Sequence, residues 1–219
     1  MNLDLFEQDE PQRRTEQLAP GAVILRGFAY DRAPALMSAI NAVAARAPFR
    51  HMVTPGGYTM SVAMSNCGPL GWVTDETGYR YSPFDPLSGQ RWPAMPALFE
   101  KLAKDAAREA GFADFTPDAC LINRYDVGAR LSLHQDKDEH DLRQPIVSFS
   151  LGLNAVFLFG GMTRSERAQR LPLAHGDVVV WGGASRLRYH GVLPLKPGSV
   201  PAYLPEMYRF NLTFRKAGT

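Results

Sequence analysis

The chain has 219 residues, of which 45% are hydrophobic and 21% are charged, and its formal net charge is +2. This length suits one folded domain over residues 1–219, and the composition excludes a disordered or a fibrous protein. The 24 basic residues barely outnumber the 22 acidic ones. Bulk charge therefore does not diagnose nucleic-acid binding, and any basic track must be local.

The opening residues 1–7 have neither the basic flank nor the apolar run of a secretory leader. No later stretch is apolar for long enough to cross a membrane. We therefore expect a cytoplasmic protein with no membrane partner. The chain has only two cysteines, Cys67 and Cys120, and in a chain of this length they are expected to be free thiols.

Two helices are predicted in the first half of the chain, after an apolar strand at residues 22–26. We expect Asp31 to cap the first helix and Pro48 to end it. Its apolar residues fall at helical spacing: Leu36, Ile40, Val43 and Ala47. The second helix is predicted to begin near Pro96 and to stop at Gly111. Its inward residues would be Leu98, Phe99, Leu102 and Ala106. Both helices are expected to pack against a sheet.

The segment between the helices, roughly residues 48–93, is rich in Gly, Pro, Tyr and Trp. The richest parts are Pro55–Tyr58, Trp72, Tyr79–Tyr81 and Arg91–Pro93. This composition is typical of short strands and turns that form a lid rather than of core scaffold.

From Cys120 onward, short apolar runs alternate with turn residues. The runs are 120–125, 131–136, 146–151, 154–159, 177–181, 187–193 and 207–215. Many short strands at this spacing predict a jelly-roll or barrel-like β core.

Two histidines and one aspartate are candidates for a metal site. If Leu131–Asp136 is a strand, His134 and Asp136 point to one face. His190 follows the strongly apolar run at residues 178–181. Two imidazoles and one carboxylate leave open positions on a metal, which is typical of non-haem iron(II) oxygenases. A structural zinc site would prefer four protein ligands, but a zinc ion with a bound water stays open on ligand type alone.

The last predicted strand, Arg209–Arg215, alternates polar and apolar residues. Arg209, Asn211, Thr213 and Arg215 share one face. If that face were exposed to solvent, this would be an ordinary edge strand. If it faces the interior, two buried cations require anions, and a dicarboxylate such as 2-oxoglutarate supplies one at each end. Asn123 and Tyr125 share a face of another strand, so that both could add hydrogen bonds to the same ligand.

Together, the motifs Asn123–Tyr125, His134–Asp138, His190 and Arg209–Arg215 closely resemble those of the AlkB family of alkylation-repair dioxygenases. The resemblance extends over residues 48–215. It implies an α+β protein with a double-stranded β-helix (jelly-roll) core at roughly residues 118–216. Flanking N-terminal helices and a nucleotide-recognition lid at roughly residues 48–93 would complete the fold.

The resemblance also implies cofactors and their ligands. Iron(II) would be held by His134, Asp136 and His190. The cosubstrate 2-oxoglutarate would meet Arg209, Asn123 and Tyr125 at one end. Its other carboxylate would meet Arg215, with Asn211 nearby. O2 would complete the set. The implied activity is oxidative demethylation of N-alkylated bases, with release of formaldehyde, succinate and CO2.

The implied partner is methylated DNA, single-stranded or with the damaged base flipped out, and RNA stays open. A monomer repairing 1-methyladenine and 3-methylcytosine by direct reversal is expected. Trp72 would stack on the base, Tyr79 would hold a backbone phosphate, and Asp138 would face the exocyclic amine. Met64 and Arg164 would border the same pocket. The basic residues near it could add phosphate contacts: Arg50, His51, Arg80, Arg91, Arg130, Lys137 and Arg164.

Two other functions compete with this interpretation. The first is an oxygenase with the same iron core that acts on a protein side chain or a small molecule. The conjunction of Trp72, Tyr79 and Asp138 with the metal motif argues against it. The second is a non-catalytic β-barrel that binds nucleic acid through aromatic loops. Such a barrel has no use for buried ionisable ligands.

Overall fold

The computed structural model describes residues 12–204 and 206–219, so the opening residues 1–7 lie outside it. The largest sheet has eight strands, all paired antiparallel. Their spatial order is β1 (Arg14–Ala19), β2 (Ala22–Arg26), β12 (Val178–Trp181), β9 (Ile146–Gly152), β14 (Arg209–Arg215), β7 (Ala119–Tyr125), β4 (Thr59–Cys67) and β3 (Arg50–Val53).

A second, four-stranded antiparallel sheet has the order β11 (Gln169–Leu173), β10 (Ala155–Phe159), β13 (His190–Val192) and β8 (Leu131–His134). One apolar cluster joins the two sheets, because it contains Val179 and Trp181 from the large sheet and Phe157 and Val192 from the small one. Two antiparallel sheets that share a core form the predicted jelly roll. With the helices described below, the α+β class is confirmed.

Every apolar run predicted after Cys120 contains a strand. Two strands that the prediction missed, β1 and β11, consist mainly of exposed and half-buried residues and contain no continuous apolar run. Both lie at the edge of a sheet, where one side of the backbone and much of each side chain meet water. An edge strand therefore lacks the apolar pattern that predicts a buried one.

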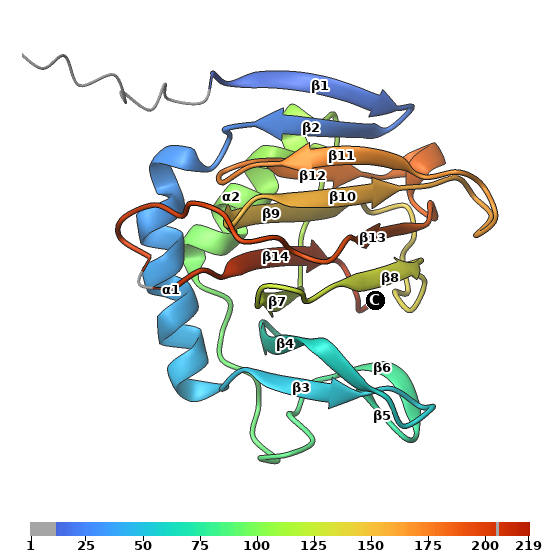
Figure 1. Ribbon diagram of the computed structural model, residues 1–219. Helices are drawn as coiled ribbons and strands as arrows, with labels where there is room; N and C mark the ends of the chain where they lie inside the picture. Colours follow the sequence, from blue (N-terminus) through green and yellow to red (C-terminus); the bar gives the residue numbers. More distant parts are fainter. Residues whose placement is uncertain (1–11, 205) are drawn as a thin grey trace, which may run out of the picture.

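Helices α1 (Ala33–Arg46) and α2 (Ala97–Glu109) pack on the large sheet (Figure 1). A second apolar cluster joins them to it, with Ile40 of α1 and Phe99 of α2 among buried side chains of β9, β12 and β14. Among the described residues, no helix has the length and apolar character needed to cross a membrane.

The helix boundaries confirm one prediction and correct another. Pro96 precedes α2, and Gly111 follows it with φ of 90°. The expected cap of α1 by Asp31 is wrong. Asp31 already lies in a 3₁₀ turn, Tyr30–Arg32, and no side chain caps α1. The preceding turn continues the chain into the helix, and a proline in its first turn leaves one fewer backbone N–H that needs a partner.

The segment between the helices contains short strands and turns, as predicted. However, one of these strands belongs to the core and not to a lid. The second half of β4 is buried and pairs with β7 from Ala63 to Cys67, so it belongs to the large sheet. The hairpin of β5 (Gly71–Asp75) and β6 (Gly78–Ser82) forms a separate two-stranded sheet. This β5–β6 hairpin lies at the same end of the molecule as β3 and β4 (Figure 1).

Cys67 and Cys120 are both free, which confirms that prediction. They lie opposite each other on β4 and β7 and are fully buried. Burial raises the pKa of the Cys120 thiol well above its usual value. Both side chains therefore act as small core residues.

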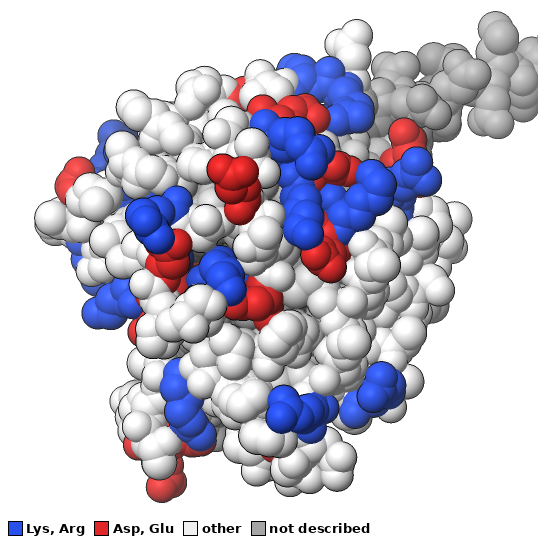
Figure 2. Space-filling model, turned by 180° about the vertical axis from the view of Figure 1, so that it is seen from behind, with Lys and Arg blue, Asp and Glu red and all other residues white. Residues whose placement is uncertain are grey.

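The outer surface of α2 carries charges of both signs that pair with one another. Lys101 and Arg108 contact Asp105, and Lys104 contacts Glu100. Figure 2 shows basic and acidic side chains interspersed on the face turned away from the view of Figure 1. That face does not present a track of one sign.

Candidate active site

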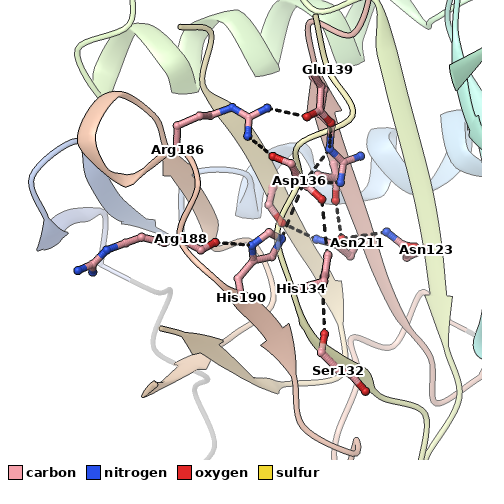
Figure 3. A network of polar contacts seen from close by, with 12 residues as sticks. Asn123, Ser132, His134, Asp136, Glu139, Arg186, Arg188, His190 and Asn211 are labelled. Carbon is pink, nitrogen blue, oxygen red and sulfur yellow. Dashed lines mark hydrogen bonds and ion pairs between the residues drawn. The ribbon is translucent and has the colours of Figure 1, made fainter. Parts of the chain in front are cut away.

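A cluster of two histidines and one aspartate lies where β8 and β13 meet. His134 and His190 are directly opposite each other in the antiparallel pair. Strand β8 ends at His134, so Asp136 lies beyond it, yet its carboxylate returns to the two imidazoles (Figure 3). One ligand atom from each residue lies within 4.8 Å of the others. The predicted convergence is therefore confirmed, although the strand is shorter than expected.

Backbone carbonyls fix the orientation of both imidazoles. Nδ1 of His134 donates to the carbonyl of Ser132 over 2.9 Å, and Nδ1 of His190 donates to that of Arg188 over 3.2 Å. A carbonyl only accepts, so each Nε2 keeps its lone pair free for a metal. Burial, followed by the charge of His134, lowers the pKa of His190 to about 3. His190 is thus neutral, as a metal ligand must be, at ordinary pH.

The aspartate of the cluster is held as an anion. Nε and Nη2 of Arg215 lie 2.8 and 2.7 Å from its Oδ2. Burial of Asp136 acts to raise its pKa, but Arg215 and the two imidazoles outweigh burial and hold that pKa well below its usual range. Its Oδ1 lies 3.6 Å from Nε2 of His134. Two imidazoles and one ionised carboxylate fit iron(II) in ligand type and leave coordination positions for other groups.

Gly191 permits the close approach of the two strands that carry the histidines. A Cβ on this glycine would lie 2.7 Å from the backbone oxygen of Leu131. We expect Gly191→Ala to force β13 away from β8, to lower the free energy of unfolding by about 1–3 kcal/mol and to weaken metal binding. Urea unfolding and Mn(II) titration measure the two effects. Gly198→Ala is the matched control, because its Cβ has no contact closer than 3.6 Å. Parent-like behaviour of both variants would contradict the prediction.

Arg209 is a buried cation without an anion among the described residues. Its side chain lies over the ring of Tyr125 at 4.9 Å, and its Nη2 donates to Oγ of Ser150 over 3.0 Å. Within the described part of the chain, its Nε and Nη1 have no hydrogen-bond partner, and neither does Oδ1 of Asn123. Burial lowers the pKa of Arg209, but a guanidinium stays charged in proteins. Unpaired donors on a buried cation that lines a cavity fit an incoming carboxylate.

The polar face of β14 points inward, which excludes the solvent-exposed edge strand. Arg209, Asn211, Thr213 and Arg215 are each at most 6% exposed. Asn211 is fully engaged, since its amide nitrogen donates to Ser148 and to the backbone of Phe149 and its oxygen accepts from Asn123 and Thr213. Asn211 therefore orients Asn123 and leaves the free oxygen of Asn123 at the cavity.

The two arginines of β14 differ in their need for an external anion. Arg215 already lies against Asp136, and its Nε lies 3.4 Å from Oε1 of Glu139. These carboxylates raise the pKa of Arg215 despite its burial. The argument that both buried cations need a ligand's anions therefore holds for Arg209 alone. A contact of Arg215 with the cosubstrate stays a prediction.

All predicted site residues line one cavity of about 770 Å³. The lining includes Trp72 and Tyr79 of the β5–β6 hairpin and Met64 of β4, together with Asp138 and Arg164. Met64 is 2% exposed, whereas Tyr79 is 51% exposed. The rings of Trp72 and Tyr79 are stacked, with centroids 5.7 Å apart and an interplanar angle of 20°. The cavity thus joins the metal cluster to an aromatic surface.

Three residues at the site were not predicted from the sequence. Ser148 and Ser150 hold Asn211 and Arg209, and their alternation within the otherwise apolar run 146–151 was an available signal. Glu139 is 7% exposed, although it ends an acidic run of the kind that is usually hydrated. Its burial has no signal in the local sequence.

Comparison with known proteins agrees with this geometry. Residues 21–215 match the 2OG-Fe(II) oxygenase superfamily. The chain is 62% identical to the α-ketoglutarate-dependent dioxygenase AlkB of Escherichia coli (strain K12), over 99% of this chain and 98% of that one. It is 45% identical to the AlkB homolog of Caulobacter vibrioides (strain NA1000 / CB15N), over 84% and 82%. The solved structure of OsALKBH1 aligns with a TM-score of 0.81 and 31% identity, covering 93% of this chain and 100% of that one. The chain therefore belongs to the 2OG-Fe(II) oxygenase superfamily, as a dioxygenase of the AlkB type that uses iron(II), 2-oxoglutarate and O2.

Proposed function

We propose that this dioxygenase removes methyl groups from N-alkylated bases, chiefly 1-methyladenine and 3-methylcytosine, in single-stranded or base-flipped DNA. The observation that carries the proposal is the cavity that joins the metal cluster to the stacked rings of Trp72 and Tyr79. Relatives named as demethylases of nucleic acid support it: a DNA N(6)-methyladenine demethylase of Arabidopsis thaliana is 36% identical over 67% of this chain, and a tRNA demethylase of Schizosaccharomyces pombe is 34% identical over 62%. RNA is thus a further candidate substrate.

The residues around the metal would bind and orient the reactants. His134, Asp136 and His190 would hold iron(II). Arg209, with Asn123 and Tyr125, would bind one carboxylate of 2-oxoglutarate, and Arg215, with Asn211 nearby, would face the other end. When bound, iron(II), 2-oxoglutarate and O2 together oxidise a C–H bond of the substrate and yield succinate and CO2. Hydroxylation of an N-methyl group gives a hydroxymethyl base, which releases formaldehyde and leaves the unmodified base.

The substrate base must leave its stack, because a methyl group within a paired duplex does not reach a recessed metal site. In the proposed complex Trp72 stacks on the flipped base, and the exposed hydroxyl of Tyr79 holds a backbone phosphate. Stacking of a base on an aromatic side chain contributes about 1–3 kcal/mol. The contact between the two rings would then give way to contacts with the nucleotide, while buried Met64 would form part of the pocket wall.

Among the described residues, two of the candidate basic side chains pair with a carboxylate. Arg50 pairs with Asp85 over 2.6 Å, and Arg80 pairs with Asp75 over 2.6 Å. In contrast, Arg130, Lys137 and Arg164 line the cavity. We assign the phosphate contacts to these three side chains, since their charge is placed where a strand entering the cavity would pass.

Mass spectrometry of methylated oligonucleotides incubated with iron(II) and 2-oxoglutarate tests the proposal. We expect loss of the methyl group together with formaldehyde and succinate from single-stranded DNA that contains 1-methyladenine or 3-methylcytosine. The unmodified oligonucleotide is the control. Succinate formation with a methylated peptide or small molecule, but not with oligonucleotides, would favour a different oxygenase. Oligonucleotide binding without any consumption of 2-oxoglutarate would favour a non-catalytic binding protein.

Asp138 is proposed to select cationic lesions. The extended strand ends before it, at His134, but its side chain lines the cavity. Methylation at N1 of adenine or N3 of cytosine makes the base cationic, so a nearby carboxylate favours the lesion over its neutral product. We expect Asp138→Asn to lower kcat/KM for these lesions more than for neutral 1-methylguanine or 3-methylthymine, with iron and 2-oxoglutarate binding unchanged.

Kinetics on paired cationic and neutral oligonucleotides measure this selectivity. Asp114→Asn is the matched control, because Asp114 is exposed outside the cavity and the variant loses the same charge. Equal losses on cationic and neutral lesions, or parent-like rates on both, would remove Asp138 from the recognition residues and leave it as a hydrated surface carboxylate.

The proposed setting is a monomer in the cytoplasm. The buried thiols of Cys67 and Cys120 are free, which fits a reducing compartment. Analytical ultracentrifugation of the iron-loaded protein, with and without oligonucleotide, tests the oligomeric state, and fractionation of cells tests the compartment.

A further inference from the structure

Glu139 contacts three separate parts of the molecule, and no role in the reaction has been assigned to it so far. We propose that Glu139 is a positioning residue, which keeps Asp136 available to the metal and ties the β5–β6 hairpin to the metal centre. The inference rests on the proposed function, since it takes His134, Asp136 and His190 as the metal ligands and Trp72 as the residue that stacks on the base.

The side chain of Glu139 is buried and contacts three other side chains. Its Oε1 accepts a hydrogen bond from the hydroxyl of Tyr81 over 2.6 Å and lies 3.4 Å from Nε of Arg215. Its Oε2 accepts from Nη2 of Arg186 over 2.9 Å. The side chain of Glu139 is 2% exposed and that of Arg186 is 4% exposed. Water therefore does not screen these contacts, and the geometry of one partner constrains the others.

Arg186 connects this carboxylate to the backbone of the metal ligand. Its Nη1 donates to the carbonyl of Asp136 over 2.7 Å, and its Nε donates to the carbonyl of Gln144 over 2.9 Å. Figure 3 shows Arg186, Glu139 and Asp136 in one continuous network beside the two histidines. The segment that carries Asp136 is thus held from its backbone by Arg186 and from its carboxylate by Arg215.

Charge balance explains why a second carboxylate is needed here. Arg186 and Arg215 contribute two positive charges, and Asp136 and Glu139 contribute two negative ones. Because Arg215 contacts both carboxylates, Asp136 does not have to neutralise it alone. Without the charge of Glu139, the excess positive charge would repel a dication, and Arg215 would hold Oδ2 of Asp136 more strongly. Both effects oppose metal binding.

Tyr81 extends the network into the hairpin. It lies on β6 directly opposite Trp72 of β5. The hydrogen bond from its hydroxyl to Glu139 spans 58 positions of the sequence. A ring held at this point fixes the strand that carries Trp72 relative to the metal ligands. Glu139 thereby sets the distance between the base-stacking surface and the metal.

The metal half of the proposal is tested with Glu139→Gln and Glu139→Asp. Gln keeps the size of the side chain and removes its charge. Asp keeps the charge, but its side chain is one methylene shorter, so the carboxylate lies farther from its partners. We expect Mn(II) affinity, measured by titration calorimetry at fixed pH, to fall about 10- to 100-fold in Glu139→Gln and by less in Glu139→Asp. Parent-like affinity in both would overturn this half. If Glu139→Gln does not fold, an undiminished affinity in Glu139→Asp overturns it in the same way.

The hairpin half is tested with Tyr81→Phe, which removes one hydroxyl and no charge. Amide hydrogen exchange of residues 71–82 should become about tenfold faster or more, as expected for a lost hydrogen bond to a charged group, while Mn(II) affinity stays unchanged. Tyr203→Phe is the matched control, since its hydroxyl contacts His175, outside the cavity. Unchanged exchange in Tyr81→Phe, or equal acceleration in both variants, would overturn the tie.

These readouts separate the inference from the proposed function. If the parent protein does not bind Mn(II), or binds it undiminished after loss of His134, the proposed metal site itself fails. If the parent binds Mn(II) through that site and the Glu139 and Tyr81 variants behave like it, only the positioning role fails. Turnover of methylated oligonucleotide is not needed for either conclusion.

Discussion

Replacing His134, Asp136 or His190 with alanine is expected to reduce turnover of methylated oligonucleotide below detection. Each side chain supplies one of the three ligand atoms that lie within 4.8 Å of one another. A site with only three protein ligands has no spare one, so the loss of any ligand leaves iron weakly held and misplaced. Metal affinity should fall together with activity.

The three alanine variants should differ in stability. Their comparison therefore shows whether a loss of activity results from loss of the metal or from unfolding. The side chain of His134 is 35% exposed, so His134→Ala should leave the fold nearly unchanged. His190 packs against Trp181 with ring centroids 4.9 Å apart, and its removal opens a cavity. Asp136→Ala leaves Arg215 with Glu139 as its remaining carboxylate, so Asp136→Asn is the milder test.

Mn(II) titration, thermal unfolding and turnover, measured on the same preparations, check this prediction. His134→Ala decides it, because a folded variant without metal affinity is expected there. If all three variants bound metal and demethylated like the parent, the metal site would have to lie elsewhere.

The two buried arginines of β14 should have different effects on the free energy of unfolding when each is replaced by methionine. Arg209 has two donor nitrogens without a partner among the described residues, so Arg209→Met removes a buried, uncompensated charge. Its free energy of unfolding without ligands should be equal to or higher than that of the parent. Arg215→Met leaves Asp136 and Glu139 without their shared cation, and breaking such a buried pair costs about 3–5 kcal/mol.

Binding of 2-oxoglutarate should also distinguish them. A hydrogen bond to a charged group contributes about 1.5–3 kcal/mol. Losing one such contact in Arg209→Met should therefore lower the affinity for 2-oxoglutarate roughly 10- to 150-fold. Urea unfolding without ligands and anaerobic titration of 2-oxoglutarate into the metal-loaded variants give the two quantities. Unchanged cosubstrate affinity in Arg209→Met, or a marked loss of stability in this variant, would show that the unpaired nitrogens of Arg209 do not bind a carboxylate of 2-oxoglutarate.

The sequence predicts most of the core strands because buried strands need a continuous or alternating apolar pattern. It does not predict β1 and β11, whose edge positions remove that need. The expected cap at Asp31 fails for a different reason. An aspartate is a favoured capping residue, but here Asp31 lies in a 3₁₀ turn that leads directly into α1. The capping preference of a single residue does not predict such a turn.

The site shows the same limit at the level of single residues. Alternation along β14 correctly places Arg209 and Arg215 on the inner face, since strand periodicity is a local property. The burial of Glu139 depends on Arg186, 47 positions away, and on Arg215 in the last strand. No local pattern reveals that a glutamate in an acidic run faces two guanidiniums, because only the closed fold brings them together.

The position of β14 in the sheet has a consequence for the order in which the protein matures. This strand follows β7 and β9 in the chain but lies between them, paired with both. During synthesis from the N-terminus, β7 and β9 leave the ribosome before the strand that separates them exists. Until β14 is synthesised, the edges of β7 and β9 that it will pair with have no native partner. Such exposed strand edges can pair with other chains. Because Arg209 and Arg215 arrive with it, closure of the sheet and completion of the proposed cosubstrate site are a single event. A ribosome stalled just before residue 209 would therefore display an aggregation-prone chain that lacks both proposed cosubstrate-binding arginines.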